Sequence, residues 1–440
     1  MEGTPAGDSM ARVKAFRGIY YQDQAGAISG LVAPPYDVLS VEEADRFREQ
    51  SPHNVARITV SRRGDPGFYW NAGRLFESWL QDGILSRAEK PGIYFYEIEF
   101  DYTLGGEIRK ARRSGFFALL GLADYSQGEV LRHERTLKGP KLDQFNLLSA
   151  ARANLSPIFC LYSDPRMKLM IELARAKKAK PIFDFEFSGF RHRLFGIDDP
   201  RLVSKVSAAL LKEKVYIADG HHRYETALEY YHRLCFAKDP LRESAGYVMS
   251  FFCAQEDPGL VIFPYHRLVR HLAEERLVDL MDRLKEDFRI EPVSDHFSKE
   301  NADRVFQELD ATGNQRAMVL VDAQKRAFLL KLKAALADAR ENLLDVEILE
   351  DLILKRILRI SKEELAENKF VVYETSEQKL VERMRTEIFQ LVFLMKPIPV
   401  VKMVERALRG EVMPEKSTYF YPKLPSGMLF RKIDPGPELS

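Results

Sequence analysis

Residues 215–226 constrain the fold of this chain more than any other segment. They read Val-Tyr-Ile-Ala-Asp-Gly-His-His-Arg-Tyr-Glu-Thr. Val215 and Ile217 alternate with smaller or polar residues, as in a short buried strand, and an Asp-Gly pair typical of turns follows. Helical spacing begins at His221. The segment therefore predicts a strand that ends in a tight turn and leads directly into a helix.

The first turn of this predicted helix collects groups that suit a phosphate. A helix N-terminus offers unpaired N–H groups and the positive end of the helix dipole, and His221, His222 and Arg223 add basic side chains there. Asp219 would repel a phosphate unless it holds a metal ion or takes a proton from an acceptor. We therefore interpret the block as a phosphoryl-transfer site. A helix cap flanked by surface histidines is the alternative.

The composition of the chain excludes several classes of protein. Its 440 residues are enough for two or three domains, and 66 Lys and Arg nearly balance 65 Asp and Glu, which leaves a net charge of +1. A neutral chain argues against a nucleic-acid partner. No apolar run approaches the roughly 18–20 residues of a membrane span, and residues 1–10 lack the apolar core of a secretory signal. We therefore expect a cytoplasmic protein with no membrane partner.

A second polar cluster spans residues 132–143 and holds five basic groups and two carboxylates. Almost nothing in it is apolar, so core packing does not explain it. We predict an anion-binding loop in which His133, Thr136 and Lys141 donate to phosphate oxygens. Glu134 would then act as a base or a metal ligand. A solvated charged loop is the alternative.

A third block, residues 413–427, is rigid and rich in donors although it lies near the chain end. Three prolines fix its backbone, and three consecutive aromatic residues form a wall. Its predicted phosphate donors are Lys416, Ser417, Thr418 and Lys423. We interpret the block as a docked lid or phosphate cradle, and an aromatic edge strand is the alternative.

Two further polar residues extend the predicted site. Asp37 stands in a loop that a proline pair holds rigid, and Asn154 precedes an apolar strand at the rim of the site. Ser40 is better placed than Asp37 to cap the helix predicted for residues 41–50. Asp37 is therefore a candidate catalytic carboxylate, and Asn154 is a candidate binding residue.

The chain contains alternating helices and strands without an internal repeat. We predict a flexible tail over residues 1–10 and an N-terminal α/β domain over 11–165. The phosphoryl-transfer block would belong to a segment over residues 166–290. A C-terminal α/β region over 291–440 would end in the lid-like third block.

Local patterns predict several individual elements of the N-terminal region. Residues 55–61 are rich in β-branched side chains and predict a strand, whereas 69–85 predict an amphipathic helix. Residues 92–102 and 114–122 alternate like strands and are expected to pair as a hairpin.

Six blocks in this order are similar to one bacterial and archaeal family, known as domain of unknown function 1015. The blocks are Phe16-Arg-Gly, Ala33-Pro-Pro-Tyr-Asp-Val, His133-Glu-x-Thr with Gly139-Pro-Lys, Asn154-x-Ser-Pro-Ile-Phe, Ala218-Asp-Gly-His-His-Arg-Tyr-Glu-Thr-Ala and Met413-Pro-x-Lys-Ser-Thr-Tyr-Phe-Tyr-Pro-Lys. The chain is identified as a member over nearly its whole length.

The Asp-Gly-His-His-Arg block also resembles the signature of free-serine kinases with a ParB/sulfiredoxin-type fold. The resemblance implies an α+β protein whose mixed-sheet, ParB/sulfiredoxin-like core is elaborated by additional α/β domains. It implies that Asp219 lies in the catalytic centre, where it could hold Mg²⁺. His221, His222 and Arg223 would hold donor phosphates. An earlier carboxylate would be the base, and Asp37 and Glu134 are both candidates.

The activity that the resemblance implies is phosphoryl transfer to free L-serine, giving O-phosphoserine. Some family members resemble pyrophosphate-dependent serine kinases, and the chain lacks both a P-loop and a kinase-type Gly-rich loop, which fits pyrophosphate or a differently held nucleotide as donor. Mg²⁺ is expected, without an organic cofactor. The expected partners are the donor and a hydroxy amino acid, and a homodimer is compatible with the sequence. A ParB-like nucleotide switch acting through a partner, and a metal-dependent phosphohydrolase, are the alternatives.

Overall fold

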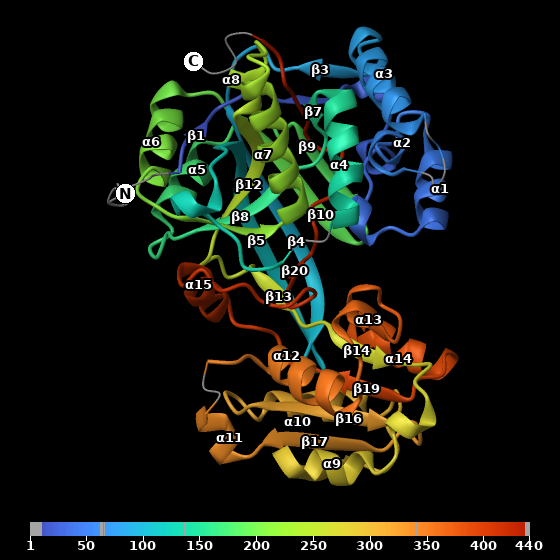
Figure 1. Ribbon diagram of the computed structural model, residues 1–440. Coiled ribbons are helices and arrows are strands. Elements are labelled where there is room, and N and C mark those ends of the chain that lie inside the picture. Colours follow the sequence, from blue (N-terminus) through green and yellow to red (C-terminus); the bar gives the residue numbers. More distant parts are fainter. Residues whose placement is uncertain (1–10, 62–64, 66, 136–137, 340–341, 436–440) are drawn as a thin grey trace.

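The computed structural model describes residues 11–61, 65, 67–135, 138–339 and 342–435. The predicted tail and the predicted phosphate ligand Thr136 lie outside the described residues. Figure 1 shows a large lobe built on one long sheet and a smaller lobe below it. Two long strands, β4 (Ile93–Leu104) and β5 (Glu107–Gly121), reach from the first lobe to the second.

The sheet of the large lobe is mixed and, over the described residues, nine-stranded. In spatial order its strands are β6 (Val130–Leu131), β11 (Val215–Asp219), β8 (Ile158–Tyr162), β12 (Tyr247–Ala254), β5, β4, β10 (Phe190–Ile197) and β9 (Phe183–Phe187), with β1 (Val13–Lys14) paired to β5. β6 is parallel to β11 and β8 to β12, whereas the other neighbours are antiparallel. The predicted hairpin is confirmed as β4 and β5, and the α+β class with a mixed sheet is confirmed. The ParB/sulfiredoxin-like description of the core stays a prediction.

Both faces of the central part of this sheet are buried, and for that reason β8, β12 and residues 115–121 of β5 are mostly apolar. Along β5, Phe116 and Leu120 join one core cluster, while Phe117 and Leu119 join another on the opposite face. Helices also contribute to the first cluster, among them α5 (Lys168–Ala176), α6 (Pro200–Leu210) and α7 (His221–Phe236). The second cluster continues into the smaller lobe.

Short helices and strand pairs complete the large lobe. The helices are α1 (Val41–Gln50), α2 (Ala56–Thr59), α3 (Phe68–Gln81), α4 (Lys138–Ala151) and α8 (Arg242–Ala245), with short 3₁₀ helices at Asp23–Ala25, Ile28–Gly30, Tyr36–Val38 and Tyr125–Gln127. The strand pairs are β2 (Ile19–Tyr21) with β3 (Leu85–Arg87), and β7 (Ala153–Asn154) with β21 (Arg431–Lys432).

The helix predicted at residues 41–50 is confirmed as α1, and Ser40 caps it in a capping box with Glu43. The helix predicted at 69–85 is confirmed as α3 up to Gln81, whereas Leu85 already belongs to β3. The strand predicted at 55–61 is wrong, because this stretch forms α2. The buried Asn54 side chain accepts a hydrogen bond from the N–H of Ala56 at 2.9 Å. This local cap favours a helical turn over the β preference of the branched side chains.

The smaller lobe is built on an antiparallel sheet, which contains six strands over the described residues. Its order is β15 (Phe288–Ser294), β17 (Ala327–Leu332), β16 (Ala317–Asp322), β19 (Leu391–Leu394), β14 (His266–Val269) and β18 (Val371–Glu374). Its helices are α9 (Leu280–Asp287), α10 (Ala302–Asp310), α11 (Ala334–Ala339), α12 (Asp345–Ile348), α13 (Lys362–Ala366), α14 (Glu377–Thr386) and α15 (Val400–Leu408), with a 3₁₀ helix at Glu274–Arg276 and a π-helix at Leu349–Ile357.

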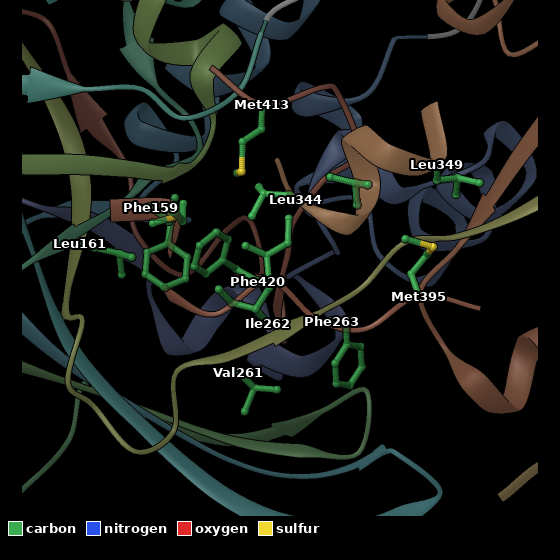
Figure 2. Close-up of a cluster of buried hydrophobic side chains, with 14 of the residues drawn as sticks. Phe159, Leu161, Val261, Ile262, Phe263, Leu344, Leu349, Met395, Met413 and Phe420 are labelled. Atoms are coloured by element: carbon green, nitrogen blue, oxygen red, sulfur yellow. The ribbon is translucent and has the colours of Figure 1, made fainter. Parts of the chain in front are cut away.

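The two lobes are joined by a two-stranded ribbon and an apolar cluster. The ribbon pairs β13 (Val261–Phe263) with β20 (Tyr419–Tyr421), so each connection between the lobes supplies one strand. Figure 2 shows Phe420 of this ribbon between Phe159 of the large-lobe sheet and Leu344 of the smaller lobe. Residues after 413 therefore return to the large lobe, where Phe430 bonds to Ile19.

This arrangement divides the chain differently from the predicted domains. β8 precedes residue 165 and β11 and β12 follow it, yet all three strands are neighbours in one sheet. The predicted boundary at 290 falls inside β15. A boundary based on sequence order does not detect such interleaving, because strand neighbours are set by long-range pairing.

The tip of the β4–β5 hairpin is a third link between the lobes. The N–H groups of Gly105 and Gly106 donate to the two carboxylate oxygens of Glu377, on α14, at 2.7 and 3.0 Å. A Cβ added to Gly106 would approach the backbone of Asp303 to 2.7 Å. Only glycine therefore allows this close approach between the hairpin and the smaller lobe.

We predict that Gly106→Ala destabilises the protein more than Gly128→Ala. Both glycines have left-handed backbones, with φ of 72° and 76°, so both substitutions carry the same backbone strain of about 1–2 kcal/mol. A Cβ on Gly128 meets no atom within 4 Å, whereas one on Gly106 meets α10. The extra loss should reach about 1–3 kcal/mol in urea unfolding. Equal losses would contradict this contact between the lobes.

Candidate functional site

The segment 215–226 forms the predicted strand, turn and helix as β11 and α7. Gly220 joins them with a left-handed φ of 91°, and a Cβ there would lie 3.0 Å from the guanidinium of Arg223. Glycine is thus required both by the backbone and by the side chain that folds back over the turn. The turn delivers Asp219 and Arg223 to the same point.

Asp219 is held between two cations, one four residues further along the chain and the other 204 positions away. Its Oδ2 accepts a hydrogen bond from Arg223 Nη2 at 2.7 Å, and its Oδ1 pairs with the ammonium of Lys423. Burial raises the pKa of Asp219, but Lys423 and Arg223 outweigh that effect and hold it below the usual range. The carboxylate is therefore ionised at neutral pH, and the first and third sequence blocks meet at it.

Two predicted phosphate ligands, His133 and His221, form a buried pair with ring centroids 4.8 Å apart. His133 Nδ1 donates to the carbonyl of Ile217 at 2.8 Å, so its Nε2 accepts from the Thr418 hydroxyl at 2.9 Å. Burial lowers the pKa of His133 to about 4 and that of His221 well below its ordinary value. Both rings are therefore neutral at neutral pH and add no positive charge to the site.

Three other predicted phosphate ligands, Ser417, Thr418 and Asn154, form hydrogen bonds within the protein. This differs from the prediction that they donate to phosphate. The Ser417 hydroxyl donates to the Pro414 carbonyl at 2.6 Å, and Thr418 bonds to His133. Asn154 Oδ1 accepts from the N–H of Met249 at 3.0 Å. All three polar side chains are buried. Their hydrogen-bonding groups are used to fix the frame around Asp219.

Glu134 and the segment 413–418 are tied together by the backbone. The N–H of Lys416 donates to Glu134 Oε1 at 3.0 Å, and the N–H of Met413 donates to the His133 carbonyl at 2.8 Å. Burial raises the pKa of Glu134 to about 7, although the hydrogen bond from Lys416 acts in the opposite direction. Glu134 is therefore a carboxyl that exchanges a proton near neutral pH.

Arg267, on β14 of the smaller lobe, is a site residue that sequence reasoning missed. Its Nη2 donates to the Lys416 carbonyl at 3.0 Å, and its guanidinium lies 5.6 Å from the centre of the Tyr373 ring. Only 4% of Arg267 is exposed. The available signal was an arginine beside the apolar pair Leu268-Val269 in a buried strand, because a fully buried arginine requires specific partners. Arg267 links the smaller lobe to the loop that contacts Glu134.

Charged groups of the second and third blocks and of the Asp37 loop act on His222, in the first block. Its partial burial lowers its pKa, and the carboxylates of Glu225 and Asp37 act in the opposite direction. The ammonium groups of Lys141 and Lys416 add to the lowering. Lys141 also forms an ion pair with Glu225. The structure therefore brings Lys141, Lys416 and Asp37 to the helix end that the sequence singled out.

The second block is only partly the loop that we predicted, because α4 begins at Lys138. Its proline lies in the first helical turn, where the lack of an N–H costs nothing. Asp37 lies on an exposed 3₁₀ turn between Tyr36 and Val38. Burial raises the pKa of Tyr419, and the charges of Asp37 and Asp219 add to that effect, so both carboxylates lie around this ring.

The profile of the family described as "Protein of unknown function (DUF1015)" matches residues 13–352. The chain belongs to this family. No curated protein matches the DUF1015 chain.

Solved structures give distant likenesses to this DUF1015 protein. A free serine kinase mutant in complex with ADP is 15% identical, with a TM-score of 0.34 over 68% of this chain and 89% of its own. A conserved hypothetical protein from Pyrococcus furiosus is 14% identical, with a TM-score of 0.34 over 69% and 92%. SbnI with a C-terminal truncation, from Staphylococcus aureus, is 10% identical, with a TM-score of 0.30 over 70% and 84%.

Asp219 does not fit the predicted role of a preformed Mg²⁺ ligand in this arrangement. Both of its oxygens already accept from cationic side chains, and within the described ranges no three His, Cys, Asp or Glu residues group as metal ligands. Mg²⁺ favours oxygen ligands free of such neighbours.

In the part of the chain that the structure describes, no helix is long and apolar enough to cross a membrane.

We predict that Asp219→Asn destabilises this DUF1015 protein by about 3 kcal/mol. The substitution leaves Lys423 and Arg223, whose side chains are 11% and 12% exposed, without their anion. The double variant Asp219→Asn with Lys423→Met should recover part of the loss, because it removes one unpaired charge.

Urea unfolding of both variants measures this coupling. Glu229→Gln is the matched control, since the Glu229–Arg233 pair lies on the same helix but is exposed, and it should cost less than about 1 kcal/mol. If Asp219→Asn were as stable as the wild type, the two cations would not depend on Asp219.

Proposed function

We propose that this protein is a small-molecule kinase that transfers a phosphoryl group from pyrophosphate, or from a nucleotide, to the hydroxyl of L-serine or a similar hydroxy amino acid. One observation carries the proposal: Asp219, paired with Arg223 and Lys423, shares a site with Glu134, whose pKa burial raises to about 7 and whose carboxyl the charge of Lys423 also reaches. A fixed charge framework beside a titrating carboxyl is what hydroxyl activation requires. The choice of serine comes from the resemblance of the Asp-Gly-His-His-Arg block.

The basic groups suit the donor. Phosphoryl transfer is catalysed mainly by positioning and by neutralising the charge of the phosphate oxygens. Lys423, Arg223, Lys141 and Lys416 bring ammonium and guanidinium groups to this region, and the N-terminus of α7 adds the positive end of its helix dipole. Because the neighbouring histidines are neutral, the lysines and arginines are the groups that would hold the donor.

In the proposed reaction, Glu134 takes the proton of the acceptor hydroxyl. The freed oxygen forms a bond to the phosphorus of the donor while the bond from phosphorus to the leaving phosphate breaks, and the leaving phosphate keeps the electron pair. Asp219 holds Lys423 and Arg223 in place, so its role is to position the cations. Mg²⁺ remains a prediction. If it takes part, it would neutralise charge on the donor phosphates.

The first test is to incubate the protein with Mg²⁺, L-serine and, in turn, pyrophosphate, ADP and ATP, and to measure phosphoserine by mass spectrometry. Phosphoserine formation is the expected result. Phosphate release without phosphoserine would favour a phosphohydrolase, and tight nucleotide binding without turnover would favour a ParB-like switch. A parallel series without Mg²⁺ tests the metal requirement.

We predict that Glu134→Gln lowers kcat by about 10²–10⁴-fold, because a positioned general base contributes that much. In the wild type, kcat should rise with pH through about 7, as the Glu134 carboxyl loses its proton. Glu134→Gln should lose this rise. Asp37→Asn is the comparison variant: if it removes turnover and Glu134→Gln keeps the wild-type pH profile, Asp37 is the base.

The Glu134 carboxyl should also make the stability of the protein depend on pH. Stability should fall as pH rises, whereas kcat should increase. The folded pKa of Glu134, about 7, lies above its ordinary value of 4.5, so the folded state binds the proton more tightly than the unfolded state. Stability is therefore lost as pH rises from about 4.5 to 7. Glu134→Gln removes this loss, and its melting temperature should exceed that of the wild type at pH 8 but not at pH 4.5. An equal difference at both values would contradict the raised pKa.

A further inference from the structure

A cleft of about 830 Å³ lies between the two lobes, and Lys423 and Tyr419 form part of its wall. The hairpin of β4 and β5 lines it on one side, as do the start of α14 and the proline loop that carries Asp37. Because Lys423 also pairs with Asp219, the cleft leads directly to the proposed site of transfer.

The cleft is much larger than free serine requires. Pockets of about 300–1,000 Å³ enclose ligands of drug-like size, which have several times the atoms of one small amino acid. A serine beside Lys423 would leave the region near the hairpin tip and α14 unfilled. The size therefore points to an acceptor that carries a substituent.

The charges that line the cleft favour a cation over an anion. Four carboxylates line it: Glu43, Asp101, Glu374 and Glu377. Glu377 accepts the N–H groups of Gly105 and Gly106, Asp101 lies 3.6 Å from the Lys110 ammonium, and Glu374 lies 3.9 Å from the Arg383 guanidinium, but neither of these two cations lines the cleft. The lining ammonium groups among the described residues are Lys379 and Lys423, and Lys423 is already paired with Asp219. His192 also lines the cleft, but burial lowers its pKa to about 4, so it is neutral. A second acidic group on the ligand would be repelled.

Much of the apolar wall is aromatic, beside prolines and the aliphatic side chains of Val38, Leu39 and Ile108. It includes Phe47, Phe187, Phe190, Tyr102, Tyr419 and Tyr421, all of them half-buried. Tyr421 stacks on Phe263 with ring centroids 4.3 Å apart, and Phe190 meets Tyr421 edge-on at 5.8 Å. Ring faces attract both aromatic groups and ammonium groups. Carboxylates and rings together make a surface suited to an amine with an aromatic substituent.

We propose that this cleft binds the acceptor, and that the preferred acceptor is a serine-like hydroxy amine extended by an uncharged aromatic group. The inference rests on the proposed function for the transfer step, but the binding itself does not require turnover. The hydroxyl would lie beside Lys423, and the substituent would extend along Tyr421 and Phe190 towards the hairpin.

The experiment uses the full-length protein and three probes: L-serine, L-seryl-L-phenylalanine amide and L-seryl-L-glutamate. Calorimetry measures binding, and phosphoserine analysis with pyrophosphate, ADP or ATP measures transfer. We expect the amide to bind at least about 10-fold more tightly than L-serine, and the glutamate probe to bind less tightly than the amide.

Two variants locate the probe. Asp101→Asn and Phe190→Leu should each weaken binding of the amide by about 2- to 5-fold, with little effect on L-serine. Glu172→Gln on α5 is the charge control, and Phe236→Leu, at a position 93% exposed, is the aromatic control. Neither control residue lines the described cleft, so both should leave amide binding unchanged.

The outcomes separate this inference from the proposed function. If L-serine is phosphorylated but the amide neither binds nor reacts, the proposed function stands and the inference is overturned. If the amide binds through Asp101 and Phe190 but no probe is phosphorylated, the cleft assignment stands and the kinase proposal fails. Displacement of the amide by adenosine, lost in Phe190→Leu, would assign the cleft to a nucleotide and overturn the inference.

Discussion

The ion pair between Asp219 and Lys423 joins residues 204 positions apart, and the geometry of the whole site depends on it. Without the two cations, burial would favour the protonated form of Asp219. Without Asp219, Lys423 and Arg223 would be buried cations that lack their anion, so the three side chains stabilise one another. Lys423 follows β20, the C-terminal strand of the inter-lobe ribbon. The need of Asp219, at the end of β11, for a cationic partner therefore fixes the path of the C-terminal segment that carries Lys423.

A second tie makes the first one rigid. His133 spans from the Ile217 carbonyl on β11 to the Thr418 hydroxyl before β20, and Glu134 accepts the N–H of Lys416. Arg267 then holds the same loop from the smaller lobe. Because His133, Thr418 and Arg267 are buried and hydrogen-bonded, a shift of the loop would leave polar groups unpaired. The smaller lobe thus stabilises a site whose carboxylates belong to the larger one.

Turns and helix ends could be predicted from the sequence, whereas the hydrogen-bond partner of each polar side chain in the site could not. The Asp-Gly turn before His221 and the helix at residues 41–50 follow from turn, cap and periodicity rules, and the structure has both. The roles of His133 and Thr418 depend on a hydrogen bond across 285 positions, which no local pattern contains. The strand predicted at residues 55–61 failed for a related reason, since one buried asparagine decides its conformation.

The titratable groups of the site lose or gain protons at very different pH values, because burial and neighbouring charges shift their pKa values in different directions. His133 and His221 are neutral because burial lowers their pKa values, and Asp219 is ionised because two cations hold its pKa low. None of these three groups changes protonation between about pH 5 and 8. Glu134 does, because its pKa is about 7. Of these four groups, Glu134 alone exchanges a proton near neutral pH, and it does so beside a fixed charge framework, which is what the proposed general base requires.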